Sequence, residues 1–231
     1  MTTRRSDVVF LLDCDNTLLD NDAVIDALSE HLMATVGPEC HDRYWEIYET
    51  LRTECGYADY LGALQRYRLA NLTDSRILEM SSWLVDYPFA ERLYPDALAV
   101  VRRLDALGTT VMLTDGDAVF QPRKVIRSGL WNAVGGRVEI FIHKEEMLDA
   151  IREQYPAEHY VLVDDKLRLL TAFKMGWGDA VTTVFPRQGH YAHDPELCSR
   201  YPAADVTIER IGDLLTLDPS LLMPRTSRGQ T

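Results

Sequence analysis

Apolar residues along the chain fall into two kinds of pattern. Short continuous runs rich in β-branched residues are typical of strands buried on both faces of a parallel sheet, because a strand with one exposed face would alternate. Between these runs lie helical stripes at residues 95–107, 145–155 and 167–175, of which the first and the last end at a glycine. This alternation predicts a doubly wound, mainly parallel α/β sheet. The predicted strands are residues 8–12, 110–113, 138–142, 160–163, 181–185 and, as a short last strand, 206–208.

One long segment interrupts the alternation. From about Asn21 to Asp86 there is no strand-like run, and four helical stripes follow one another, the first two ending at Gly37-Pro38 and Gly56. Four helices inserted after the first strand are typical of a small helical bundle. We therefore predict an α-helical cap at residues 21–90 on a core formed by residues 1–20 and 91–231. The polar ends, residues 1–6 and about 224–231, are expected to be frayed.

Charge and cysteine usage narrow the class of protein. The 231 residues carry 36 acidic and 24 basic side chains, a net charge of −12, which disfavours a nucleic-acid binder because such proteins neutralise phosphates with cations. A small phosphorylated substrate remains compatible, because a bound metal ion can invert the local charge. No apolar run approaches the roughly 20 residues of a membrane span, and Asp13 ends the first run too soon for a secretion signal. The four cysteines have no CxxC pairing or metal-ligand spacing, so we interpret them as reduced thiols of a cytoplasmic protein. The oligomeric state stays open.

Two acidic pairs follow predicted strands. Asp13 and Asp15 come directly after the first strand, and Asp164 and Asp165 follow the fourth long one. Either pair alone could form an Asx turn or cap the next helix. Ligands of open α/β sheets, however, bind at the carboxyl ends of the strands, and four carboxylates in one crevice repel one another unless a cation is present. Oxygen ligands of this kind suit Mg²⁺, so we predict a magnesium site there.

The second long strand ends at Thr114. Its hydroxyl, and a turn at Asp115 and Gly116 whose backbone N–H groups can face an anion, make a candidate phosphate site, whereas Asp117 is interpreted as part of an ordinary turn. Two lysines could supply a fixed cation. Lys144 follows a strand and is the candidate, and Lys124 is interpreted as a solvated helix residue or a contact at the rim of the crevice.

Two further groups of residues are ambiguous. The polar loop at residues 187–193 could line the mouth of the crevice, but we interpret it as a surface loop. The aromatic residues of the inserted helices lie at helical spacing and are expected in the core rather than in contact with substrate. They include Trp45, Tyr48, Tyr60 and Trp83.

Taken in order, these residues resemble the four motifs of the haloacid dehalogenase-like (HAD) hydrolase superfamily. The motifs are Asp13-x-Asp15-x-Thr17, Thr114, Lys144 and Asp164-Asp165. Each is weak alone, but the ordered set is specific and covers nearly the whole chain. The resemblance implies a Rossmann-like core with an α-helical cap inserted after the first motif. Two departures are that Glu145, not proline, follows the lysine, and that Leu169 stands where a further acidic residue often occurs.

The resemblance also implies a role for each motif. Asp13 would be the nucleophile that forms an aspartyl-phosphate, and Asp15 the general acid/base. Thr114 would hold a phosphoryl oxygen, and Lys144 would neutralise the nucleophile and the phosphate. Mg²⁺ would be held by Asp13, the backbone carbonyl of Asp15, and Asp165, with Asp164 close by.

The second aspartate of the first motif indicates the type of reaction. A leaving alkoxide needs a proton and the attacking water then needs a base, so Asp15 favours phosphate esters. Family members that cleave carbon–halogen or carbon–phosphorus bonds replace this residue. We predict a Mg²⁺-dependent phosphatase acting on a small phosphorylated metabolite. The alternatives are a phosphomutase of the same fold and a non-catalytic protein that binds phosphate or a partner.

Overall fold

The centre of the molecule is a six-stranded sheet. The computed structural model describes residues 6–223, so the prediction for the two ends lies outside the described residues apart from Ser6. All strand pairings are parallel, in the order β3-β2-β1-β4-β5-β6, which confirms the predicted doubly wound sheet. The strands are β1 (Ser6–Leu12), β2 (Thr109–Asp115), β3 (Val138–Phe141), β4 (Ala157–Val163), β5 (Val181–Pro186) and β6 (Val206–Ile208).

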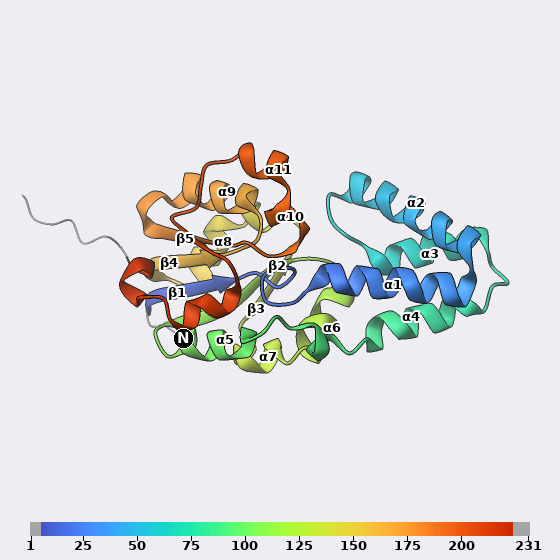
Figure 1. Cartoon of the computed structure of the whole chain (residues 1–231), viewed down its shortest axis with the longest axis horizontal. Coiled ribbons are helices and arrows are strands. Elements are labelled where there is room, and N and C mark those ends of the chain that lie inside the picture. Colours follow the sequence, from blue (N-terminus) through green and yellow to red (C-terminus); the bar gives the residue numbers. More distant parts are fainter. Residues whose placement is uncertain (1–5, 224–231) are drawn as a thin grey trace, which may run out of the picture.

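Helices cover both faces of the sheet, which is why its strands are continuous apolar runs. Along β1, Val8, Phe10 and Leu12 belong to one buried cluster, while Val9 and Leu11 belong to another. The first cluster packs against α5 (Ala97–Asp105), α6 (Phe120–Arg127), α7 (Leu130–Ala133) and the 3₁₀ helix η4 (Ile211–Leu215). The second packs against α8 (Leu148–Gln154) and α9 (Leu167–Trp177), on the opposite side of the sheet (Figure 1).

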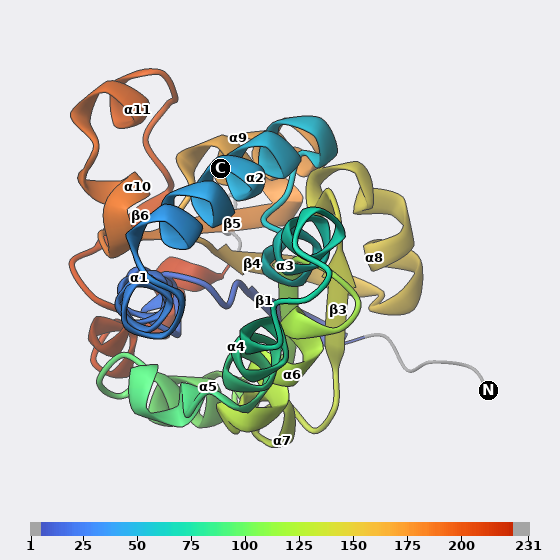
Figure 2. The same cartoon turned by 90° about the vertical axis from the view of Figure 1, so that its right-hand side faces the viewer.

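Four helices follow β1 and form a bundle of their own. Figures 1 and 2 show it standing beyond the end of the sheet at which β1 leads into α1. All four predicted helical stripes are helices in the structure. The division into a cap at residues 21–90 and a core stays a prediction. The helices are α1 (Asn21–Val36), α2 (Pro38–Cys55), α3 (Tyr60–Ala70) and α4 (Arg76–Asp86).

The two chain crossings between the sheet and the bundle lie side by side. Leu19 forms an antiparallel bridge with Leu93, and the N–H of Asp20 donates to the carbonyl of Arg92 at 2.7 Å. The segment that enters the bundle is therefore hydrogen-bonded to the segment that leaves it.

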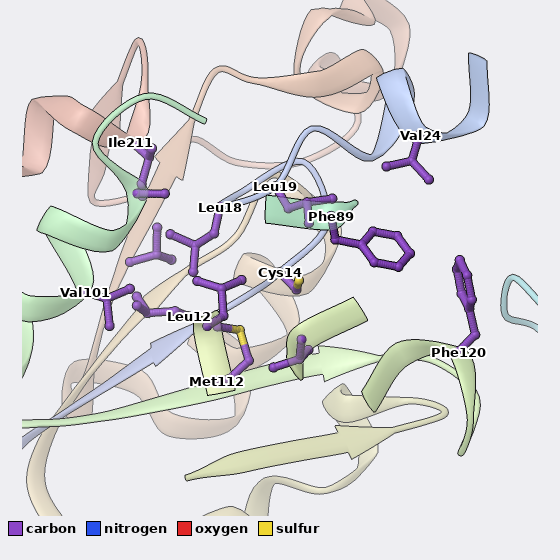
Figure 3. Packing of buried hydrophobic residues seen from close by; sticks show 14 of the residues in the cluster. Leu12, Cys14, Leu18, Leu19, Val24, Phe89, Val101, Met112, Phe120 and Ile211 are labelled. Carbon is purple, nitrogen blue, oxygen red and sulfur yellow. The ribbon is translucent and has the colours of Figure 1, made fainter. Parts of the chain in front are cut away.

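Aromatic side chains fill the junction between the bundle and the sheet. The ring of Phe120 lies 5.6 Å from that of Phe89 and 5.2 Å from that of Tyr60, measured between centroids. Figure 3 shows Phe89, Phe120 and Val24 at one end of an apolar cluster that continues to Leu12 of β1. The bundle and the sheet thus share one continuous core.

Two further observations concern the cysteines and the helices of the described residues. All four cysteines lie in the described part and form no disulfide. No helix within residues 6–223 combines the length and the apolar character that a bilayer crossing requires.

Candidate active site

Asp13 lies at the middle of the carboxyl edge of the sheet. It directly follows β1, which lies between β2 and β4. The N–H of Asp13 donates to the carbonyl of Val163 at 3.0 Å and so extends the β1–β4 ladder toward Asp164. The hydroxyl of Thr17 accepts the N–H of Asp165 at 3.1 Å and joins the same two loops. The strand order thus brings together motifs that are 148 residues apart in the chain.

Asp13, Asp164 and Asp165 form a buried acidic cluster, in which one carboxylate oxygen from each residue lies within 4.8 Å of the others. Both oxygens of Asp165 are buried without a hydrogen-bond partner among the described residues. Burial raises the pKa of Asp165 well above its ordinary value, because the charge cannot be hydrated there. Oxygen atoms without a proton donor suit a divalent cation such as Mg²⁺, so the residues present fit that ion.

A buried lysine contacts this acidic cluster. Lys144 begins the short helix η2 (Lys144–Glu146) after β3, and its Nζ lies 2.5 Å from Oδ1 of Asp13 and 2.7 Å from Oδ2 of Asp164. Burial alone would lower the pKa of Lys144. The charges of Asp13 and Asp164 outweigh that effect and raise the pKa above its ordinary value. The structure places Lys144 against the predicted nucleophile.

The side chain of Asp15 pairs with a different lysine. Nζ of Lys124 lies 2.7 and 2.8 Å from the two carboxylate oxygens of Asp15 and 2.9 Å from Oδ1 of Asn21. Lys124 lies on α6 and is 0% exposed, so its interpretation as a solvated or rim residue is wrong. A charged lysine tolerates such burial only with a counter-charge, which Asp15 provides. Of the four carboxylates expected to converge, three form the acidic cluster, and that of Asp15 is paired with Lys124 instead.

The turn after β2 differs from the expected anion cradle. The N–H of Gly116 donates to the carbonyl of Phe141 at 2.8 Å, so this amide is not free to face an anion. Thr114 is buried, and its hydroxyl accepts a hydrogen bond from Nε2 of Gln121 at 3.0 Å. A Cβ at Gly116 would lie 2.6 Å from Cβ of Gln121. Close packing against Gln121 therefore explains this glycine.

The two aspartates of this turn accept hydrogen bonds from backbone N–H groups. Oδ1 of Asp115 accepts the N–H of Lys144 at 2.8 Å, and burial raises the pKa of Asp115 to about 6. Oδ1 of Asp117 accepts the N–H groups of Val119 and Phe120 at 2.8 and 2.7 Å, where α6 begins. Asp117 thus forms an ordinary turn, as predicted.

The motifs that carry this geometry also identify the family. The profile of the haloacid dehalogenase-like hydrolases matches residues 8–175, which include the acidic cluster and Lys144. The chain belongs to this family. A solved haloacid dehalogenase-like hydrolase from Burkholderia xenovorans LB400 is 65% identical, with a TM-score of 0.88 over 92% of this chain and 99% of its own.

More distant solved structures share the fold of this hydrolase. The HAD-hydrolase YfnB from Bacillus subtilis, bound to magnesium, is 17% identical, with a TM-score of 0.60 over 92% of this chain and 98% of its own. The L-2-haloacid dehalogenase from Xanthobacter autotrophicus is 20% identical, with a TM-score of 0.56 over 96% of this chain and 99% of its own. No curated protein matches the chain.

A cavity of about 320 Å³ lies between the sheet edge and the inserted helices of the hydrolase. Asp165 lines it on the sheet side, and Tyr48 and Tyr60 line it on the helical side. These two tyrosines are buried, as predicted, yet they also face the cavity. Trp45 and Trp83 do not line it and pack against the apolar cluster. Part of the predicted helical core is therefore also cavity wall.

The loop at residues 187–193 reaches the same cavity. It contains α10 (Gly189–His193), of which His190 and Tyr191 are cavity-lining residues. Nδ1 of His190 lies 2.6 Å from Oδ1 of Asp22, and Arg52 donates to the hydroxyl of Tyr191 at 2.6 Å. This loop therefore bridges to α1 and α2, beyond what a plain surface loop would do.

Two polar residues buried beside Asp15, Gln121 and Asn21, were not predicted from the sequence. Nε2 of Gln121 lies 3.3 Å from Oδ2 of Asp15, and Asn21 reaches it through Lys124. Gln121 and Lys124 are three positions apart, so they share one face of α6. That face also carries the buried Phe120. Polar residues on the apolar face of a helix next to a candidate site are the signal that could have found them.

Proposed function

We propose that this hydrolase is a Mg²⁺-dependent phosphatase that cleaves a small phosphate monoester through an aspartyl-phosphate at Asp13. The main support is Asp165, whose two oxygens are buried and unpaired beside Asp13 and Asp164. Mg²⁺ would be held by Asp13, Asp165 and the backbone carbonyl of Asp15, with Asp164 close by. When bound, the ion would supply positive charge to the phosphoryl oxygens.

The reaction would proceed in two steps. The carboxylate of Asp13 attacks phosphorus and the bond to the leaving oxygen breaks, while Asp15 donates a proton to that oxygen. Asp15 then accepts a proton from water, whose oxygen attacks phosphorus and frees Asp13. Lys144 would balance the charge of Asp13 and of the phosphoryl group, and the hydroxyl of Thr114 would donate to a phosphoryl oxygen. Asp15 favours phosphate esters over carbon–halogen bonds, because a halide leaves without a proton.

The inserted helices would enclose the substrate. We propose that residues 21–90 act as a cap over a core of residues 1–20 and 91–231, because the cavity is lined from both sides. The size of the cavity supports a small metabolite, and the net charge of −12 argues against a polyanionic partner. The cytoplasmic location stays a prediction.

Hydrolysis of p-nitrophenyl phosphate tests this function. We expect release of phosphate with Mg²⁺ and none with excess chelator, and no halide release from a 2-haloacid. Asp13→Asn should fold and show no turnover, whereas Asp179→Asn, at an exposed site, should keep the wild-type rate. Halide release, or full activity of Asp13→Asn, would contradict the proposal. Transfer of the phosphoryl group to a sugar phosphate in preference to water would support the phosphomutase alternative.

A further inference from the structure

Lys124 uses its whole hydrogen-bonding capacity inside the protein. An ammonium group has three N–H donors. In the structure Nζ lies 2.7 and 2.8 Å from the two oxygens of Asp15 and 2.9 Å from Oδ1 of Asn21. Each donor therefore has a partner. Unlike a lysine poised to bind phosphate, Lys124 has no donor left for a substrate.

Asp15, in contrast, remains open to the cavity. Its side chain is 26% exposed and lines the cavity, while that of Lys124 is 1% exposed. Gln121 approaches the carboxylate from the side of Thr114 and donates to Oδ2 of Asp15 at 3.3 Å. Both oxygens of the carboxylate thus accept hydrogen bonds from within the protein, while the side chain stays partly exposed to the cavity.

Packing alone does not require a lysine at this position. A buried ion pair is often no more stable than apolar residues of the same size, because both charges lose their hydration. Lys124 lies on the apolar face of α6 beside Phe120 and Val125, where a leucine or methionine would pack. The pair is placed instead at the carboxylate that exchanges protons in the proposed reaction.

We infer that Lys124 is a positioning residue that fixes the carboxylate of Asp15 for proton exchange with the leaving oxygen and with water. The inference rests on the proposed function, in which Asp15 is the general acid/base. Two contacts from one ammonium group prevent the carboxylate from rotating, and a proton moves efficiently only across a short, aligned hydrogen bond. Through Asn21, the first residue of α1, Lys124 also ties Asp15 to the base of the inserted bundle.

The dependence on the leaving group tests this role. Phenolate needs a proton as it leaves, and p-nitrophenolate needs it much less. We expect Lys124→Met to lower kcat/KM about 100-fold for phenyl phosphate and less than about 10-fold for p-nitrophenyl phosphate. Lys174→Met, the same substitution remote from the cavity, should leave both values within about twofold of the wild type.

A double variant separates positioning from general damage. In an Asp15→Asn background, Lys124→Met should lower kcat/KM by less than about twofold, because the group that it positions is already gone. Equal losses for both substrates, or full multiplication of the two effects, would overturn the inference.

A second variant covers a failure of Lys124→Met to fold. Asn21→Ala keeps the ion pair between Lys124 and Asp15 but removes one of the three hydrogen bonds of Lys124. We therefore expect kcat/KM to fall about 3- to 10-fold, with the larger loss for phenyl phosphate. Wild-type values for both substrates in Asn21→Ala would overturn the inference. A wild-type protein that cleaves no phosphate ester would instead overturn the proposed function.

Discussion

At the scale of single residues, the site is built on two buried lysines with different partners. Lys144 contacts Asp13 and Asp164 of the acidic cluster, while Lys124 contacts Asp15. Removing one partner of a buried ion pair leaves an uncompensated charge, which costs far more than the pair itself contributes. Each lysine should therefore matter for folding as well as for chemistry.

For Lys144→Met we expect a large loss of stability. Asp13 and Asp164 would remain buried without their counter-charge, so the free energy of unfolding should fall by about 3–5 kcal/mol at neutral pH. Urea denaturation measures this change. Lys174→Met, which breaks a half-exposed ion pair, should cost less than about 1 kcal/mol. Similar losses in the two variants would contradict the argument.

Asp165→Asn should separate stability from metal binding. In chelator the variant should fold with a Tm close to that of the wild type, because the removed carboxylate has no hydrogen-bond partner to lose and the cost of burying it is offset in part by the charge of Lys166. Mg²⁺ that binds only the folded state should raise the Tm of the wild type, whereas the Tm of the variant should not change. A series of Tm measurements over roughly 0–20 mM Mg²⁺ compares the variant with the wild type. An equal Mg²⁺-induced gain in both proteins would rule out Asp165 as a ligand.

The sequence was enough to predict the proximity of residues that follow the ends of strands. Asp13, Asp164 and Lys144 each come at the carboxyl end of a strand, so their proximity follows from a parallel sheet alone. Lys124 was misjudged because burial of a helical lysine depends on a counter-charge from a distant loop. Gly116 was misjudged for a similar reason, because the packing of Gln121 against it is not visible in a turn motif.

At the scale of elements, continuous apolar runs predicted the strands and amphipathic stripes predicted the longer helices. The short helices α10 and α11 (Pro195–Ser199) were not predicted, because five residues do not complete a recognisable stripe. The alternation of β1 between two cores explains why its run has no polar residue. The local pattern of apolar residues thus determines where the longer helices and the strands form. The shortest helices depend on tertiary contacts.

Gly108→Ala should test the close approach between the α5–β2 turn and β1. A Cβ at Gly108 would lie 2.5 Å from the carbonyl oxygen of Val8 in β1, a backbone atom that cannot rotate away. We expect a loss of about 1–3 kcal/mol in the free energy of unfolding, measured with urea. Leu107→Ala, which changes a 41% exposed neighbour, should cost clearly less, and the reverse order would contradict the packing argument.

Asp205 should give the β5–β6 edge a pH-dependent stability. Its Oδ2 accepts hydrogen bonds from Nζ of Lys174 and from the N–H and hydroxyl of Thr183, at 2.8–2.9 Å. Burial raises the pKa of Asp205, but these hydrogen bonds outweigh it and lower the pKa below the ordinary 3.8.

Because the pKa of Asp205 is lower in the folded state, its ionised carboxylate stabilises the fold at pH values above its ordinary pKa of 3.8. This contribution is lost as the pH falls through the pKa of the folded state. Asp205→Asn should therefore cost about 1–2 kcal/mol at neutral pH, discounted for partial exposure, and progressively less in acid. Urea titrations of both proteins across this pH range provide the check. A difference that grows in acid would contradict the assignment.

At the scale of the whole molecule, the sequence located the inserted helices because strand-like runs are absent between residues 21 and 86. It did not show which side chains of the bundle face the sheet, because that depends on how the helices rotate against the core. The structure places Tyr48 and Tyr60 on the cavity wall and the rings of Phe89 and Phe120 at the junction (Figure 3). Substrate preference would be determined at this junction.

The paired crossings at Leu19 and Leu93 place the entry to the bundle beside its exit. Because the chain leaves and re-enters the sheet at adjacent points, a different insert could be grafted there without rethreading any strand, provided that its base fills the apolar core shared with the sheet. Exchange of the insert would change the helical side of the cavity and leave the acidic cluster at the sheet edge as it is. New substrate preferences could then arise on the same catalytic core.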